Sequence, residues 1–168
     1  MVYGPGDRTF LSRIIPLLRQ RKMVMLGNPD TLLPLVHVRD VVAAVMLAAA
    51  SDRACGEAFN IVNNEPITQR EFLNTVAARL NVPPVRTTIP YPAAYASGFL
   101  GELAGHLFRS KNAPRLTRYP VFLFGHQRLY SAAKAQKLLG WNPSITFKDG
   151  LPEAVAAFFA NHFPTQSQ

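Results

Sequence analysis

Apolar residues recur every three or four positions in several segments of the chain, and short apolar runs separate these segments. The first pattern predicts amphipathic helices, and the second predicts strands where turn residues bound the run. We expect helices over residues 7–22, 39–51, 68–80, 92–108, 132–139 and from 147 onward, and strands over residues 23–26, 33–38, 58–62 and 85–90. Because strands alternate with helices, the chain is predicted to be α/β.

Side chains with capping chemistry mark the ends of these helices. The candidate N-terminal caps are Asp7, Ser131 and the capping boxes Thr68-x-x-Glu71 and Thr146-x-x-Asp149. Gly140 stands where a helix ends with a left-handed residue, and Pro16 is expected to kink or interrupt the first helix. The Ala-rich helix over residues 39–51 is expected to be buried, with Asp40 near its start, where a carboxylate favours the helix dipole.

Charge is distributed unevenly along this chain of 168 residues, which is 48% hydrophobic and carries a net charge of +8. Residues 103–148 contain eight bases and no acid, and we call this segment the basic window. It predicts contact with a phosphate-bearing ligand or an anionic membrane surface, or else a solvated basic face. No zinc, RNA-binding or helix-turn-helix signature accompanies the charge, so we expect no nucleic-acid partner.

The single Cys55 excludes a disulfide framework within the chain and indicates a reducing compartment. We expect it to be a small buried thiol rather than a nucleophile. The first ten residues do not resemble a signal peptide, and residues 91–108, the nearest candidate for a membrane span, contain Pro92, Glu102 and His106. The expected location is therefore cytoplasmic, with a peripheral membrane contact left open.

Residues 130–134 read YSAAK, which places a phenol and an ammonium four residues apart. On one helix face, Lys134 would favour the phenolate of Tyr130, as in the acid/base pair of a dehydrogenase. Such an enzyme also needs a glycine-rich loop between a strand and a helix, and Gly4-Pro5-Gly6 does not complete that fingerprint. We therefore interpret YSAAK as a helix start with Ser131 as cap and Lys134 pointing to water.

Three polar residues follow the predicted strand over residues 33–38. His37 alternates with valines and is either a core residue or a base, and Arg39 could reach a phosphate or a carboxylate. Asp40 is expected to cap a helix or form a pair. No cluster of His, Cys, Asp and Glu has the spacing of a metal site, and no G-x-S-x-G motif is present.

Four stretches resemble, in the same order, the C-terminal half of extended short-chain dehydrogenases, the NAD-dependent epimerase/dehydratase and 3β-hydroxysteroid dehydrogenase group. They are VYGPGD at 2–7, LPLVHVRDVVAAVMLA at 33–48, GEAFNIVNNEPITQREF at 56–72 and YSAAKAQKLLGWNPSITFKDGL at 130–151. The last resembles the terminal structural signature of that group, in which Lys134 is not the catalytic lysine. Ser131 stands where the group often has aspartate.

The resemblance implies one partial domain over residues 1–168. Residues 1–62 would complete a Rossmann sheet, and residues 63–168 would form mainly the substrate subdomain. The glycine-rich loop, the catalytic Ser or Thr and the catalytic Tyr-x-x-x-Lys of the group would lie before Met1, so we assign no catalytic residue here. Tyr3, Gly4 and Pro5 are expected to face an NAD or NADP cofactor, and His37 and Arg39 to bind substrate.

Within the group, the apolar C-terminal part resembles 3β-hydroxysteroid, sterol or 3-oxo-acyl enzymes. The implied function is the substrate-binding part of an NAD(P)-dependent oxidoreductase that is inactive as an isolated chain and a homodimer at full length. Residues 91–118 would then touch a membrane. Two alternatives remain: a nucleotide-sugar epimerase or dehydratase fragment, in which Arg39 and the basic window hold a diphosphate, or a non-catalytic, membrane-peripheral binding module.

Overall fold

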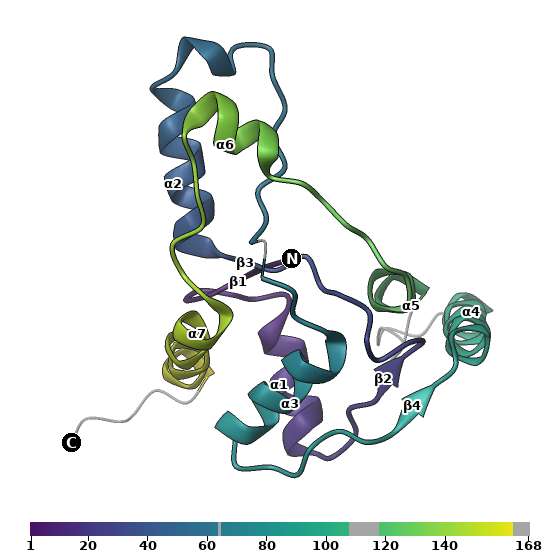
Figure 1. The fold of residues 1–168 in the computed structure, drawn as a ribbon. Helices are drawn as coiled ribbons and strands as arrows, with labels where there is room; N and C mark the ends of the chain where they lie inside the picture. The colour runs from purple at the N-terminus through teal and green to yellow at the C-terminus, as the bar shows by residue number, and fades with distance from the viewer. Residues whose placement is uncertain (64, 108–117, 163–168) are drawn as a thin grey trace.

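The structure, a computed structural model, describes residues 1–63, 65–107 and 118–162. Its strands are short and its helices supply most of the regular structure (Figure 1). The elements in chain order are β1 (Val2–Tyr3), α1 (Leu11–Arg19), β2 (Met25–Leu26), β3 (Val36–His37), α2 (Val38–Ala49), the short 3₁₀ helix η1 (Asp52–Ala54), α3 (Gln69–Arg79), β4 (Thr88–Ile89), α4 (Tyr91–Leu107), α5 (Arg118–Gly125), α6 (Ala133–Leu139) and α7 (Phe147–His162).

The strands form two parallel pairs, which confirms the α/β prediction. β1 pairs with β3 in the register Val2 to Val36, and β2 pairs with β4 in the register Met25 to Thr88. The predicted strand over residues 58–62 is wrong, because that segment is extended without joining a ladder. Its apolar pattern reflects burial instead, since Val62 is buried and Phe59 and Ile61 pack beside it.

The predicted caps at the starts of α3 and α7 are confirmed, whereas the N-cap of α1 is Phe10 and not Asp7. The Asp7 carboxylate accepts from the backbone N–H groups of Thr9, Phe10 and Leu11 at 2.7–2.8 Å, so α1 begins later than predicted. α1 also continues through Pro16, so the helix is not interrupted there. The Thr146 hydroxyl accepts from Asp149 N–H at 3.2 Å and donates to its carboxylate at 2.6 Å.

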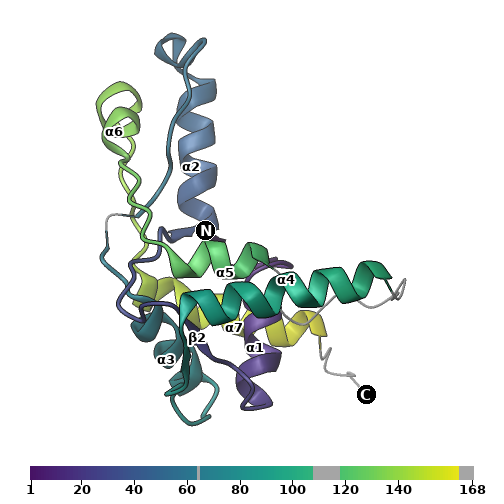
Figure 2. The same cartoon turned by 90° about the vertical axis from the view of Figure 1, so that its right-hand side faces the viewer.

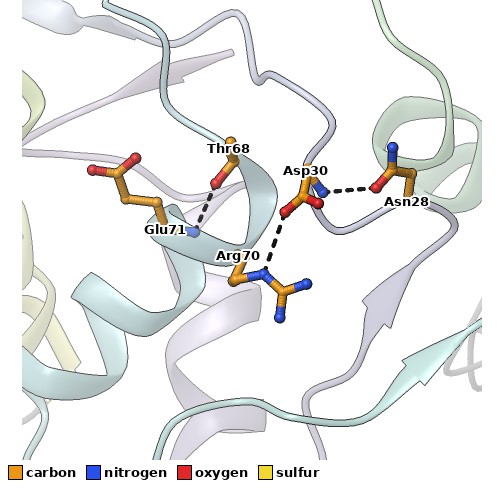
Figure 3. Close-up of polar contacts among 5 residues, drawn as sticks. All are labelled: Asn28, Asp30, Thr68, Arg70 and Glu71. Carbon is orange, nitrogen blue, oxygen red and sulfur yellow. Dashed lines mark hydrogen bonds and ion pairs between the residues drawn. The ribbon is translucent and has the colours of Figure 1, made fainter.

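The start of α3 is tied to the turn that follows β2 (Figure 3). The Thr68 hydroxyl accepts from the N–H of Glu71 at 3.1 Å, which confirms the predicted cap. One residue into the helix, Arg70 forms an ion pair with Asp30 at 3.3 Å, and the N–H of Asp30 donates to the Asn28 side chain at 3.0 Å.

The helix cap at α6 is displaced by one residue from the prediction. Its N-cap is Ala132, although the Ser131 hydroxyl still accepts from the N–H of Ala133 at 3.2 Å. Gly140 ends the helix with φ +67°, as predicted. The buried Cys55 expected from sequence is wrong, because this thiol is exposed just after η1.

Two apolar clusters organise the chain. The main core is built on α1, α3 and α7 with help from α5, and its aromatic centre is Phe10, Phe72 and Phe147. A second, smaller cluster lies between α2 and α6, which stand together apart from the main core (Figure 1). Its buried members are Val36, Ala44, Val62, Ala132, Ala135, Leu139 and Trp141. We call α2, η1 and α6 with this cluster the α2–α6 lobe.

The remaining helices, α4 and α5, lie side by side on another flank of the main core (Figure 2). α4 confirms the single helix predicted over residues 92–108. No helix among the described residues is long and apolar enough to cross a membrane.

Candidate functional site

Tyr3, which was predicted to face a cofactor, has a buried side chain in the core behind its loop. Its hydroxyl donates to the backbone oxygen of Thr146 at 3.3 Å, and its ring meets His37 and Phe147 edge-on at 5.2 and 5.7 Å between centroids. Burial, together with the carboxylates of Glu65, Asp40 and Asp149, raises the pKa of Tyr3. The phenol therefore stays protonated at neutral pH, and the predicted cofactor contact of Tyr3 stays a prediction.

Gly4 occupies a position that no larger residue can share without displacement. Its φ is +140°, and a Cβ added there would lie 2.6 Å from a methyl carbon of Val38 and 3.0 Å from His37 Nε2. Glycine permits both the conformation and the close approach of this loop to the start of α2. The assignment of Gly4 and Pro5 to a cofactor site stays a prediction.

His37 is fully buried, with 0% of its surface exposed, and it serves as the N-cap of α2. Its Nδ1 accepts from the N–H of Arg39 at 3.3 Å, so the neutral ring carries its proton on Nε2. That atom is buried beside Gly4 without a hydrogen-bond partner among the described residues. Burial lowers the pKa of His37 and the Arg39 charge adds to that, while Glu153 and Asp40 act in the opposite direction. The ring is thus neutral at pH 7, and its predicted substrate contact stays a prediction.

Arg39 is placed on the surface at the first turn of α2, with 65% of its side chain exposed. Its guanidinium forms an ion pair with Glu153 of α7 at 2.5 Å. The carboxylate that the sequence suggested for Arg39 is therefore supplied within the chain. A role for Arg39 in substrate binding stays a prediction.

Asp40 links two distant segments through a buried carboxylate. It accepts from the backbone N–H groups of Ser144 and Ile145 at 3.0 and 3.2 Å and from the Ser144 hydroxyl at 2.7 Å. Its backbone oxygen accepts from Trp141 Nε1 at 2.9 Å. Asp40 therefore fastens the start of α2 to the turn between α6 and α7, 101 to 105 residues further along the chain.

A pocket of about 250 Å³ opens at the amino ends of β1 and β3. It lies between the start of β1, the extended segment 59–62 and the segment that joins α5 to α6. The lining residues are Met1, Pro34, Phe59, Asn60, Ile61, Val62, Leu123, Arg128 and Tyr130. None of the five predicted site residues lines it, because Tyr3, Gly4, Pro5, His37 and Arg39 follow the carboxyl-end side of the same two strands.

Arg128 is the one basic side chain of this lining, and no acid contributes to it. Its guanidinium lies 3.7 Å from the centroid of the Phe122 ring and donates to the backbone oxygen of Phe122 at 3.0 Å. In the sequence, Arg128 stands out only as a member of the basic window and Tyr130 only as a member of YSAAK. No local signal separates Arg128 from the other bases, because its neighbours in the pocket come from remote segments.

Tyr130 and Lys134 do not share a helix face, since Tyr130 precedes α6 and is 47% exposed. The Lys134 ammonium forms an ion pair with Glu57 and lies 5.3 Å from the centroid of the Phe59 ring. Lys134 is thus half-exposed and paired rather than simply pointing to water. These contacts favour the structural interpretation of YSAAK over the catalytic one.

The basic window is described only in part. Arg109, Lys111 and Arg115 lie outside the described residues, so the phosphate or membrane contact expected of the whole window stays a prediction. Within the described part of the chain, no group of three or more His, Cys, Asp or Glu side chains could hold a metal ion.

Comparisons with known proteins agree with this architecture. Residues 1–62 match the model of the NAD dependent epimerase/dehydratase family. A sterol-4-alpha-carboxylate 3-dehydrogenase (decarboxylating) of Mus musculus is 34% identical over 94% of this chain and 45% of its own length. A 2-alkyl-3-oxoalkanoate reductase of Shewanella oneidensis is 26% identical over 94% of this chain and 42% of its own length. The chain therefore spans less than half the length of these two relatives.

Solved structures share the fold. A UDP-glucuronic acid 4-epimerase from Bacillus cereus, in complex with NAD, superposes with a TM-score of 0.65 at 16% identity, over 96% of this chain and 42% of that protein. The RMD protein of Pseudomonas aeruginosa, complexed with NADPH, gives 0.56 at 18% identity, over 94% and 44%. With the family match over residues 1–62 and relatives aligned along nearly the whole sequence, the chain belongs to the NAD-dependent epimerase/dehydratase family.

Proposed function

We propose that this chain supplies the substrate-binding side of an NAD(P)-dependent oxidoreductase that interconverts a secondary alcohol and a ketone on an apolar substrate. The observation that carries the proposal is the alignment of nearly the whole chain with two relatives whose names refer to largely apolar substrates. The pocket at the amino ends of β1 and β3 has no part in it, because it lies at the opposite ends of these strands from the loop of Tyr3, Gly4 and Pro5.

The names of the relatives support the same substrate class. One name refers to the dehydrogenation of a sterol 4-carboxylate at position 3, and the other to the reduction of a 3-oxoalkanoate. Both names describe a largely apolar molecule with a carboxylate close to the reacting carbon. Their agreement is the reason for proposing such a molecule, rather than a sugar, as the substrate.

The cofactor would be NAD or NADP, which accepts or gives the hydride. Gly4 and Pro5 would supply backbone for one wall of the cofactor site. Gly4 leaves no room for a side chain on this loop, since an added Cβ would lie 2.6 Å from Val38. The sequence contains no glycine-rich fingerprint for the pyrophosphate, so these two residues alone do not make a dinucleotide site. No described side chain is arranged as the acid/base, since the Tyr3 phenol is buried and Tyr130 is not paired with Lys134.

A thermal-shift screen of the full chain tests the substrate class. We expect a 2-alkyl-3-oxododecanoate and a sterol carboxylate to raise the unfolding midpoint by several degrees, because a ligand of the native state stabilises it. UDP-glucuronic acid should leave the midpoint unchanged. A shift with the UDP-sugar alone would favour the nucleotide-sugar alternative instead.

An activity assay tests the catalytic part of the proposal. With NADH or NADPH and the same 3-oxo acid, the chain alone should show no turnover, because the described residues contain no acid/base pair. Cofactor oxidation that Tyr130→Phe abolishes would show that YSAAK is catalytic after all. The matched control is Tyr119→Phe, which removes the hydroxyl of an exposed tyrosine of α5 outside the pocket lining.

A peripheral membrane contact through residues 91–118 is a second proposal, favoured by the surface of α4. Tyr95, Phe99 and Leu100 are exposed there, as are Tyr119 and Phe122 of the neighbouring α5. Aromatic and leucine side chains beside a basic segment suit the interface of an anionic bilayer. We expect co-sedimentation with vesicles containing phosphatidylserine and less with phosphatidylcholine alone; equal binding to both, or to neither, would contradict the contact.

A further inference from the structure

We propose that His37 is a proton-sensitive latch. While its ring is neutral, it holds the loop of Tyr3, Gly4 and Pro5 against the start of α2, and it releases this junction when the ring takes up a second proton. The inference goes beyond the proposed function, because it assigns a regulatory role that does not depend on the substrate. It rests on the hydrogen bonding of the ring, on its packing and on the acids around it.

Both nitrogen atoms of the His37 ring are placed for the neutral form. Nδ1 accepts from the N–H of Arg39 at 3.3 Å and thereby caps α2. Nε2, which then carries the proton, is buried without a hydrogen-bond partner among the described residues. A protonated ring donates from both nitrogens, so Nδ1–H would point at the N–H of Arg39 and the cap would be lost. The charge would also lie on a side chain with 0% of its surface exposed.

The ring is packed between β1, α2 and α7 and cannot move without disturbing them. Its centroid lies 5.2 Å from that of the Tyr3 ring, and its Nε2 would lie 3.0 Å from a Cβ added at Gly4. On the side of α7, a Cβ added at Gly150 would lie 2.8 Å from Cδ2 of the ring. Close-packed interiors transmit strain rather than absorb it. A protonated ring that leaves its site should therefore loosen the loop that follows β1 together with the first turn of α2.

The acids around the ring offer no acceptor for a second ring proton. The titratable and charged groups that face it are Tyr3 from β1, Arg39 and Asp40 from α2 and Glu153 from α7. The Asp40 carboxylate accepts from two backbone N–H groups of the turn before α7, and Glu153 is paired with Arg39. Neither carboxylate is hydrogen-bonded to the ring in the described part of the chain. The site therefore favours the neutral ring.

The stability of the fold should depend on pH in one direction. Burial lowers the pKa of His37 from its ordinary value of 6.5, and the Arg39 charge adds to the lowering, while Glu153 and Asp40 oppose it. As the pH falls below about 6.5, the unfolded chain therefore binds more protons at this residue than the folded chain does. The contribution of the neutral ring to stability is complete above that pH and is lost as the pH falls towards the pKa of the folded state.

Thermal unfolding of the full chain at about pH 7.5 and about pH 5.5 tests the latch. We expect the midpoint of the unaltered chain to be several degrees lower at the acidic pH. His37→Asn keeps a side-chain oxygen that can cap α2 but does not titrate, so it should remove at least half of this difference. The smaller side chain lowers both midpoints, which is why their difference is the readout. The control is His126→Asn, which removes an exposed histidine of the segment after α5 and should leave the difference unchanged.

A second measurement observes the ring directly by nuclear magnetic resonance on the unaltered chain. The Cε1–H resonance of His37 should titrate below the ordinary pKa, and the amide resonances of Gly4 and Arg39 should shift or broaden with the same midpoint. The amide of Asp52 in η1 provides the control. A ring that titrates at or above the ordinary pKa, or an Arg39 amide that does not respond, would overturn the latch. Equal pH dependence of the unaltered chain and His37→Asn would overturn it too. If His37→Asn does not fold, the ring titration alone decides.

Discussion

The main core and the α2–α6 lobe are stabilised in different ways. In the main core, helices from distant parts of the sequence close around Phe10, Phe72 and Phe147, whose rings lie 5.1–5.4 Å apart between neighbouring centroids. In the lobe, Trp141 is the one large buried side chain of a cluster otherwise made of small and aliphatic residues. The lobe depends more on polar links, above all the hydrogen bonds of Asp40 and the ion pair between Lys134 and Glu57.

The outer surface of α2 shows the same contrast. Val42, Val45 and Met46 are 56%, 60% and 66% exposed, and their spacing places them on one side of the helix. The prediction that this helix is buried is therefore wrong for the described chain, where only Asp40 and Ala44 are buried. A helix can be apolar in composition and still bury a single stripe, because burial depends on what packs against each face. Four pairs of substitutions test how far the two regions differ.

The largest effect is expected in the main core. Phe72→Ala removes a fully buried ring that meets both Phe10 and Phe147, and it should lower the free energy of unfolding by about 3–5 kcal/mol. Urea denaturation followed by circular dichroism measures the loss. Tyr119→Ala, an exposed aromatic of α5, should change stability by less than about 0.5 kcal/mol. Similar losses in the two variants would mean that the aromatic centre does not organise the core.

Asp40→Ala tests whether polar links hold the lobe. The change leaves two partly buried N–H groups and the Ser144 hydroxyl without their acceptor, and we expect a loss of about 2–3 kcal/mol. Hydrogen exchange should accelerate mainly in residues 141–145 and in α6. Asp52→Ala, an exposed aspartate of η1 in the same lobe, provides the control. Unchanged exchange around Trp141 would show that apolar packing alone is sufficient there.

Gly4→Ala examines the junction between the two regions. The added methyl would lie 2.6 Å from a methyl carbon of Val38, and alanine would have to adopt a φ of +140°. We therefore expect a loss of about 1–3 kcal/mol. At Gly6 the φ is +84° but no atom lies within 4 Å, so Gly6→Ala should cost about 1 kcal/mol from conformation alone. Thermal unfolding of the two variants isolates the packing part of the cost. Equal midpoints would remove the argument for a close approach.

The smallest effect compares two helix caps. Thr68→Ala removes the hydroxyl that accepts from Glu71 N–H at the start of α3, which should cost about 1 kcal/mol. Ser131→Ala should cost less than about 0.5 kcal/mol, because Ser131 precedes the actual N-cap of α6 and is exposed. Denaturation midpoints order the two variants. A larger loss at Ser131 would mean that α6 depends on this hydroxyl more than its geometry indicates.

The sequence by itself determined the features that depend on neighbouring residues. The caps at Thr68 and Thr146, the left-handed Gly140 and the extent of α4 follow from hydrogen bonds and conformations within a few positions. The four matching stretches likewise indicated the family, because their order along the chain is a property of the sequence alone.

Only the tertiary structure decided the features that need a distant partner. Residues 58–62 resemble a strand, but in the described chain they join no ladder, and only the N–H of the following Asn63 reaches the segment before β3, at Leu35 O. Asp40 meets Ser144 and Ile145, and Lys134 meets Glu57 and Phe59, only after the chain has folded back on itself. Charge and polarity in a sequence specify what a side chain can bind, whereas packing between remote segments specifies which partner it reaches.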